Sequence, residues 1–269
     1  MAASLARNTT GSRALRRWGY HRRTVSALDL DRLTPTKRPE GRARSGTQKW
    51  RSLLFLHYRL PASAVRAVVP PELELDLWDG QALVGVVPFE MVDIRPSWLP
   101  GAFALDFLET NLRTYVHYRG EPGVYFFSLE ASSRLAVQAA RWGWSLPYHY
   151  AEMREERKDN GTVIYETERV SDPEAKLEVS YRPGAELGPS KPGSVEFFLL
   201  ERYFLFSKRR GRVLKGQVHH VPYPAHTAQL LSERCGLMRA AGLDVDGPPV
   251  LVHYSPGVDV EVFGPWPVG

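Results

Sequence analysis

The sequence predicts an α+β fold that is rich in strands, with a closed or strongly curved antiparallel sheet and a few peripheral helices. Roughly ten segments either alternate between apolar and polar residues or are apolar throughout, as β-strands do. Short turns rather than helices separate most of them, so the regular strand–helix alternation that builds parallel sheets is absent. Several strands are apolar on both faces, and a closed or curved sheet would bury both faces and leave few exposed edges.

Charge is distributed unevenly along the 269 residues. Residues 1–48 carry eleven Lys or Arg and three Asp or Glu, whereas the remainder carries 24 basic and 27 acidic side chains. We therefore predict a disordered basic extension over 1–48 and a single domain over 49–269. The extension resembles a transit peptide in composition, and contact with a polyanion or a membrane surface stays open for it. The mildly acidic remainder argues against nucleic-acid binding by the folded domain.

Motifs for common cofactors are absent from the sequence. There is no Gly-x-Gly-x-x-Gly, no phosphate loop and no Cys/His cluster with zinc spacing, so we expect no cofactor and no metal. Cys235 is the single cysteine, which excludes an internal disulfide and favours a packed thiol. No apolar run is long enough to span a membrane and no export signal is present, so we expect a cytoplasmic protein with a small-molecule ligand. Homo-oligomer formation stays open.

The first half of the folded part contains four expected strands and one short helix. The helix over 61–69 begins at a proline and is closed by two more. Asp79-Gly80 is a hairpin signal, and the residues 93–105 are typical of a loop. The expected strands are 50–58, 73–78, 82–91 and 109–118.

The second half contains two further helices and the remaining strands. Ser132 or Ser133 caps a helix that runs to Trp142, and a second helix is predicted over 226–240. Asn160-Gly161 is the strongest hairpin signal in the chain. The remaining expected strands are 124–130, one from 146 to the hairpin, one after the hairpin, 177–181, 194–206, 212–221, 250–254 and 258–263.

Two charged residues interrupt the apolar run over 194–206. If this run is a strand, Glu201 and Arg202 point to opposite faces, and each needs a partner or a polar cavity because an unpaired buried charge is costly. The strand that returns from the following turn brings either His219 or His220 to within one step of Glu201. A buried Glu–Arg or Glu–His pair that fixes the register of the strands explains the same pattern.

The strand over 109–118 has one face made wholly of hydrogen-bonding residues. These are Glu109, Asn111, Arg113, Tyr115 and His117. The face is either solvated or lines a polar cavity, and the alternation itself does not separate the two.

Several stretches resemble the YqjF-like bacterial family of unknown function. The resemblance runs in order from Trp50 to Phe263. It is carried by Trp50–His57, Val84–Phe89, Asn111–Val116, Gly123–Leu129, Leu146–Tyr148, Leu200–Tyr203, Val218–His220 and His253–Val260. This family is similar to a branch of the acetoacetate-decarboxylase-like superfamily, which implies a cone-like antiparallel β-barrel with an internal pocket.

The activity of the decarboxylases is not implied by this resemblance. Those enzymes form a Schiff base with a lysine that follows a proline, whereas Tyr148 follows Pro147 here. We therefore expect no Schiff-base decarboxylation.

These patterns lead to one functional hypothesis with an alternative. We expect a small-molecule pocket inside the barrel, where Glu201 performs acid/base chemistry on a keto or carboxylic acid. The expected catalytic residues are Glu201 and Arg113. Arg113 and Arg202 would hold the anionic group. The expected substrate-binding residues are Glu109, Asn111, Tyr115, Tyr148, Arg202, His219, His220 and His253. The alternative is a non-catalytic small-molecule-binding protein, so whether the chain is an enzyme stays open.

Overall fold

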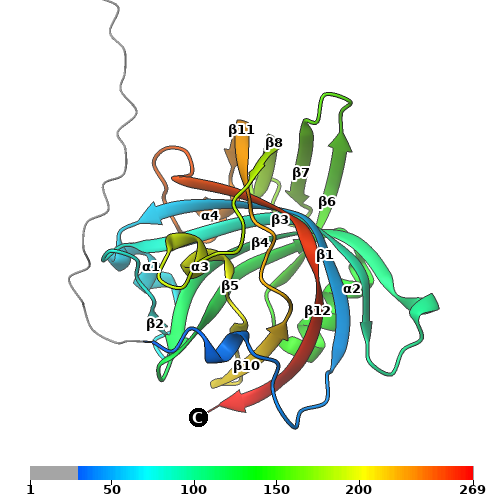
Figure 1. The fold of residues 1–269 in the computed structure, drawn as a ribbon, viewed down its shortest axis with the longest axis vertical. Helices are drawn as coiled ribbons and strands as arrows, with labels where there is room; N and C mark the ends of the chain where they lie inside the picture. Colours follow the sequence, from blue (N-terminus) through cyan, green and yellow to red (C-terminus); the bar gives the residue numbers. More distant parts are fainter. Residues whose placement is uncertain (1–29, 269) are drawn as a thin grey trace, which may run out of the picture.

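A computed structural model describes residues 30–268 of the chain (Figure 1). Within these residues the strands are β1 Gly46–Leu60, β2 Glu74–Leu75, β3 Ala82–Pro96, β4 Leu105–Tyr118, β5 Glu121–Ala131, β6 Tyr148–Arg157, β7 Val163–Arg169, β8 Lys176–Glu186, β9 Phe204–Arg209, β10 Arg212–His219, β11 His226–Cys235 and β12 Leu251–Val268. The helices are α1 Ala62–Val68, α2 Arg134–Trp144, α3 Val195–Leu200 and α4 Leu237–Ala240, with 3₁₀ turns η1 Thr34–Thr36 and η2 Gly101–Phe103.

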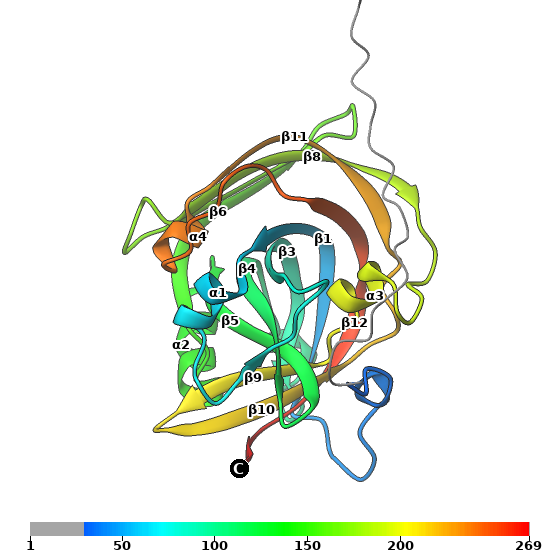
Figure 2. The same ribbon diagram turned by 90° about the vertical axis from the view of Figure 1, so that its left-hand side faces the viewer.

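The strands form one strongly curved sheet in the order β10-β9-β5-β6-β7-β8-β11-β12-β1-β3-β4-β2. Two additional pairings, β10–β12 and β5–β4, join strands that are distant in this order. Figure 2 shows β8 and β11 arching over β1, β3 and β4, with β9 and β10 on the opposite side. Most pairs are antiparallel, and β5 pairs in parallel with β6 and β9. The predicted strand-rich antiparallel fold with few helices is confirmed.

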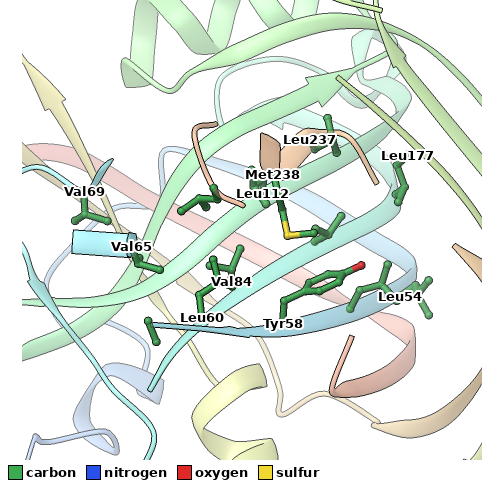
Figure 3. Packing of buried hydrophobic residues seen from close by; sticks show 14 of the residues in the cluster. Leu54, Tyr58, Leu60, Val65, Val69, Val84, Leu112, Leu177, Leu237 and Met238 are labelled. Atoms are coloured by element: carbon green, nitrogen blue, oxygen red, sulfur yellow. The ribbon is translucent and has the colours of Figure 1, made fainter. Parts of the chain in front are cut away.

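The central strands bury both of their faces, and this divides the interior into two cores. Leu54, Leu56 and Tyr58 of β1 point into a core closed by α1 and α4 (Figure 3). Leu53 and Phe55 point to the other side of the same strand, into a second core. The charged and polar groups described below lie on that second side.

Most of the elements expected before residue 146 are confirmed. The structure contains β1, α1, β3, β4, β5 and α2, and the Ser133 side chain accepts a hydrogen bond from the Ala136 backbone N–H as the predicted helix cap. The strand expected over 73–78 is reduced to the two residues of β2. The expected loop over 93–105 is shorter than predicted, because β3 continues to Pro96.

The strand predicted over 194–206 was wrong in its first half, which forms α3. Ser194 caps this helix, since its Oγ accepts a hydrogen bond of 3.1 Å from the Phe197 backbone N–H. An apolar run that is buried on all sides fits a short helix as well as a strand, so the cap decides. In the hairpin that follows, Ser207 pairs with Leu214.

The helix predicted over 226–240 was also wrong. Residues 226–235 form β11, which pairs with β8, and only 237–240 are helical. A long pairing with a distant strand overrides the local helical pattern. The two last predicted strands are one strand, β12. Gly257 allows β12 to continue beside β1 without interruption. Its φ is 132°, and a Cβ added there would lie only 2.1 Å from the Trp50 backbone oxygen.

Part of the predicted extension packs against the domain. Residues 1–29 lie outside the described part, so the prediction of disorder is untested there. The Arg32 guanidinium donates two hydrogen bonds of 2.5 and 2.7 Å to Asp76. The Gln217 side-chain amide donates to the backbone oxygens of Pro35 and Lys37. The folded part of the described chain therefore begins well before the expected boundary at residue 49.

Replacing the cap of α3 tests this reading of the fold. We expect Ser194→Ala to lower the free energy of unfolding by about 1 kcal/mol, because the Phe197 N–H loses its acceptor. Ser194→Asp keeps an acceptor oxygen at the helix start and should restore stability. Urea unfolding followed by circular dichroism measures both. Equal stability of the alanine and aspartate variants would contradict a capped helix.

Candidate functional site

Arg113 of β4 is a buried cation without an acidic partner. Its side chain lies over the ring of Phe55, with 5.6 Å between the guanidinium carbon and the ring centre. The residue is 9% exposed, and its Nε and Nη2 atoms have no hydrogen-bond partner among the described residues. No ion pair between described residues includes Arg113. Burying a charge without a compensating partner is costly, so the environment of the Arg113 guanidinium favours a negatively charged group beside it.

His57 of β1 is held in one tautomer by Tyr115. The Tyr115 hydroxyl donates to the Leu199 backbone oxygen at 3.1 Å, and His57 Nε2 lies 2.9 Å from the same hydroxyl. A carbonyl can only accept and a hydroxyl has one proton, so Nε2 must carry the hydrogen and donate it. His57 Nδ1 is then a buried lone pair without a partner. Burial, then His253 and Arg113, hold the pKa of His57 well below its ordinary value, so the ring is neutral.

His220, just after β10, is a second neutral acceptor. Its Nδ1 lies 2.7 Å from the Val221 backbone oxygen and must donate to it, which leaves Nε2 as a buried, unpartnered lone pair. Burial lowers the pKa of His220 to about 4. Its ring centre lies 4.6 Å from both Tyr203 and Tyr223.

Aromatic rings join these groups into one cluster. Phe55 contacts Tyr223 at 5.4 Å between ring centres, and Trp50 lies 5.6 Å from His220 with its Nε1 donor unpartnered. We define the Arg113 cluster as Trp50, Phe55, His57, Arg113, Tyr115, His220 and Tyr223. It offers unused donors on an arginine and a tryptophan and unused acceptors on two imidazoles. Such a set can bind an anionic group together with a hydroxyl group.

Glu201 lies beside this cluster and already holds three donors. The Tyr203 hydroxyl donates at 2.5 Å, the Ser190 hydroxyl at 3.1 Å and the Tyr223 backbone N–H at 3.2 Å. Burial raises the pKa of Glu201, and these hydrogen bonds oppose the rise. Glu201 pairs with neither Arg113 nor a histidine, and its role in acid/base chemistry stays a prediction.

Arg202 is anchored by an acidic residue. Its Nη1 donates to Asp76 at 2.7 Å and its Nε to the Phe198 backbone oxygen at 2.6 Å. The guanidinium carbon lies 5.1 Å from the centre of the Tyr115 ring, and Nη2 has no partner among the described residues. Arg202 therefore pairs with an aspartate, not with the glutamate that the sequence alternative gave as its partner.

Glu109 and Tyr148 form a separate buried pair. The Tyr148 hydroxyl donates to Glu109 at 2.8 Å. Burial raises the pKa of Glu109 to about 8, the Tyr148 bond lowers it and Glu130 raises it further. Four residues of strand separate Glu109 from Arg113 by about 13 Å, so the shared face does not bring their side chains together. Asn111 lies between them on this face, with a buried Oδ1 that lacks a partner.

The remaining predicted residues are placed as follows. The His253 ring is 6.1 Å from that of His57, so it adjoins the Arg113 cluster. His219 is half-buried at the end of β10 and is not among the hydrogen-bond partners of Glu201. Sequence reasoning did not identify Trp50, His57 or Tyr223 as site residues. The alternation of Phe55 and His57 on one face of β1 was the signal that could have revealed His57.

Two hollows lie on the surface of the part of the chain that the structure describes. One is between β5 and β9 and the other is over β6–β8, and both are lined by residues outside the Arg113 cluster. Among residues 30–268 no group of three or more His, Cys, Asp or Glu side chains is arranged to hold a metal ion. None of the described helices has the length and apolar character needed to cross a membrane.

Residues 47–259 match DUF2071, a family described as an uncharacterized conserved protein. The chain belongs to this family. The uncharacterized protein YqjF of Bacillus subtilis (strain 168) is 38% identical over 224 residues, which cover 82% of this chain and 90% of YqjF. The resemblance seen in the sequence is therefore confirmed.

Solved structures share the fold of this DUF2071 protein at low identity. Acetoacetate decarboxylase from Legionella pneumophila has a TM-score of 0.58 at 17% identity, covering 91% of this chain and 98% of that one. The enduracididine biosynthesis enzyme MppR complexed with pyruvate has a TM-score of 0.56 at 13% identity, covering 90% and 98%. An acetoacetate-decarboxylase-like enzyme from Sphingomonas wittichii has a TM-score of 0.57 at 13% identity, covering 90% of this chain and 100% of that one. These comparisons show the fold alone.

The raised pKa of Glu109 predicts a pH-dependent loss of stability in the DUF2071 domain. The carboxyl group is protonated when folded and ionises near its ordinary value of 4.5 when unfolded, so wild-type stability falls as the pH rises towards about 8. Glu109→Gln should become more stable relative to wild type over this window, by at most about 1.4 kcal/mol per pH unit. Urea unfolding between pH 5 and 8 measures the difference.

Glu261 provides the control for that measurement. Hydrogen bonds from Arg38 hold the pKa of Glu261 below its ordinary value, so its contribution is lost only as the pH falls below that value. Glu261→Gln should therefore show no such slope between pH 5 and 8. A flat difference for Glu109→Gln would show that Glu109 is ionised in the folded state.

Two buried arginines should respond in opposite ways to replacement by methionine. Arg169 pairs with the fully buried Glu130 at 2.6 Å, so Arg169→Met should lower the free energy of unfolding by about 3–5 kcal/mol. Arg113→Met removes a charge that has no acidic partner and should leave the ligand-free stability within about 0.5 kcal/mol or raise it. Denaturant unfolding of extensively dialysed protein compares them. A large loss for Arg113→Met would reveal an internal partner.

Proposed function

We propose that this protein binds a small keto or carboxylic acid at the Arg113 cluster. The observation that carries the proposal is that Nε and Nη2 of the buried Arg113 guanidinium have no hydrogen-bond partner among the described residues. Its free Nε–H and Nη2–H lie on the same edge of the planar group and form a fork. A carboxylate accepts both hydrogens of such a fork, and burial strengthens this charge-assisted pair.

The neighbouring groups support a ligand with more than a carboxylate. His57 Nδ1 and His220 Nε2 are neutral acceptors, so they suit a hydroxyl or enol group on the same molecule. Phe55, Trp50 and Tyr223 provide an apolar wall for the body of the ligand. This arrangement favours a molecule of few carbon atoms held by polar groups at its edges.

Acid/base catalysis is the second candidate, and the geometry of His57 favours it. The His57 ring is close enough for the charge of Arg113 to lower its pKa, and its Nδ1 lone pair can take a proton from the carbon α to the ketone of a keto acid whose carboxylate binds the guanidinium, which leaves an enolate. Glu201 keeps its predicted acid/base role in this version, acting through the Tyr203 hydroxyl. Turnover that survives both His57→Gln and Glu201→Gln would remove this candidate and leave binding alone.

The proposal does not include Schiff-base decarboxylation. No lysine is among the buried polar residues of the described chain. Tyr148, which follows Pro147, uses its hydroxyl to bind Glu109. The carbonyl chemistry that needs an amine nucleophile therefore has no group to perform it among these buried residues.

Calorimetric titration with acetate, pyruvate, acetoacetate and benzoate tests the binding. We expect at least one acid to bind wild type and to lose at least tenfold in affinity in Arg113→Met, because the fork is gone. Arg113→Lys keeps the charge but not the fork, and should lie between the two. Native mass spectrometry of the freshly purified protein gives an independent check for a retained acid.

Arg182→Met is the matched control for this titration. The Arg182 side chain is on β8 and donates to Thr162, away from the Arg113 cluster. Its affinity for every acid should equal that of wild type. Equal binding by wild type and Arg113→Met would overturn the proposed function.

A further inference from the structure

A second buried arginine faces Tyr115 with an unused donor. Arg202 is 8% exposed and spends its Nε on the Phe198 backbone oxygen and its Nη1 on Asp76. Its Nη2 has no partner among the described residues. Each of the two arginines that adjoin Tyr115 therefore keeps at least one free N–H.

The charge around Arg202 is only partly neutralised. Asp76 is shared, because Arg32 donates two hydrogen bonds to the same carboxylate that binds Arg202. Arg32 and Arg202 together hold the pKa of Asp76 below its ordinary value in spite of burial, so Asp76 is ionised. Two guanidinium groups and one carboxylate leave one net positive charge on this triad.

Tyr115 connects the triad with Arg113. Arg113 and Tyr115 are two residues apart on the same face of β4, and the Arg202 guanidinium carbon lies 5.1 Å from the centre of the Tyr115 ring. In agreement with this arrangement, burial raises the pKa of Tyr115, and Arg113 and Arg202 both oppose the rise. The two arginines belong to different elements, β4 and the residue pair that follows α3. A single carboxylate that fills the fork of Arg113 leaves the donor of Arg202 unused.

We propose that the ligand of this site is a dicarboxylic acid, with one carboxylate at Arg113 and the other at Arg202. This inference rests on the proposed function, and it makes Arg202 a specificity-determining residue. Two cations without acidic partners, one on Arg113 and one on the triad, are neutralised by two carboxylates. Arg32 takes part indirectly. It also binds the Asp76 carboxylate, so the negative charge of Asp76 is shared and does not fully neutralise Arg202.

A titration of the full chain with matched acids tests this inference. The diacids malonate, succinate, glutarate and adipate are compared with the monoacids of equal carbon number. We expect one diacid to bind wild type at least tenfold more tightly than its monoacid, with the optimum length set by the distance between the two guanidinium groups. Equal affinity of diacids and monoacids at every length would overturn the inference.

Variants assign the two ends of the ligand. Arg202→Met should reduce the affinity of the best diacid to that of its monoacid and leave the monoacid unchanged, while Arg113→Met should weaken both. Arg202→Lys serves where the methionine variant does not fold, and should retain part of the preference for the diacid. An unchanged diacid preference in Arg202→Lys and Arg202→Met would assign the second carboxylate elsewhere and overturn the inference.

The outcomes separate this inference from the proposed function. Monoacid binding that depends on Arg113 without any diacid preference removes the dicarboxylate and leaves the proposed function. Binding that is independent of Arg113 removes both.

Discussion

Burial of β1, β3 and β4 on both faces is the constraint on which the rest of the structure depends. Side chains that alternate along these strands enter two separate cores, and each core needs its own cover of strands and helices. A flat sheet of this size would leave one of these faces in water, so the sheet curves around them. Polar groups on the inward face are then enclosed, and removing them from water costs free energy that a partner must offset.

The chain deals with that cost differently at each buried arginine. Arg169 has Glu130, and Arg202 has Asp76, so these two follow the ordinary rule that a buried charge is paired. Arg113 lies under the same constraint with no acidic partner among the described residues. A purely structural role explains Arg169, but it gives no reason for the unused N–H groups of Arg202 and Arg113.

The sequence was informative where local pattern and burial agree. Arg113 and Glu109 were found on a polar strand face because alternation with period two determines which side chains share a face. The sequence could not show that Glu109 pairs with Tyr148 while Arg113 belongs to the Arg113 cluster. That separation depends on the distance along the strand and on neighbours such as Tyr148, which come from other elements. The apolar pattern from Val195 to Leu200 is compatible with a strand and with a helix. The strand β11 forms because it pairs with β8, and the local sequence of β11 contains no information about that distant partner. Tyr223 lies in a segment without periodicity and could not have been predicted.

The unused hydrogen-bonding atoms of His57, Asn111 and Arg113 lie on one side of β1 and β4, because that side is where polar residues were enclosed. Random placement of unsatisfied groups would reduce stability without purpose, and natural proteins keep few of them. Here donors and acceptors stand together: the fork of Arg113 beside the lone pairs of His57 and His220. The two imidazoles cannot satisfy the guanidinium themselves, since their free atoms remain unpartnered in the folded chain. Under the proposed function the enclosed set is complementary to a small acid, and binding of that acid would offset the cost of burying these groups.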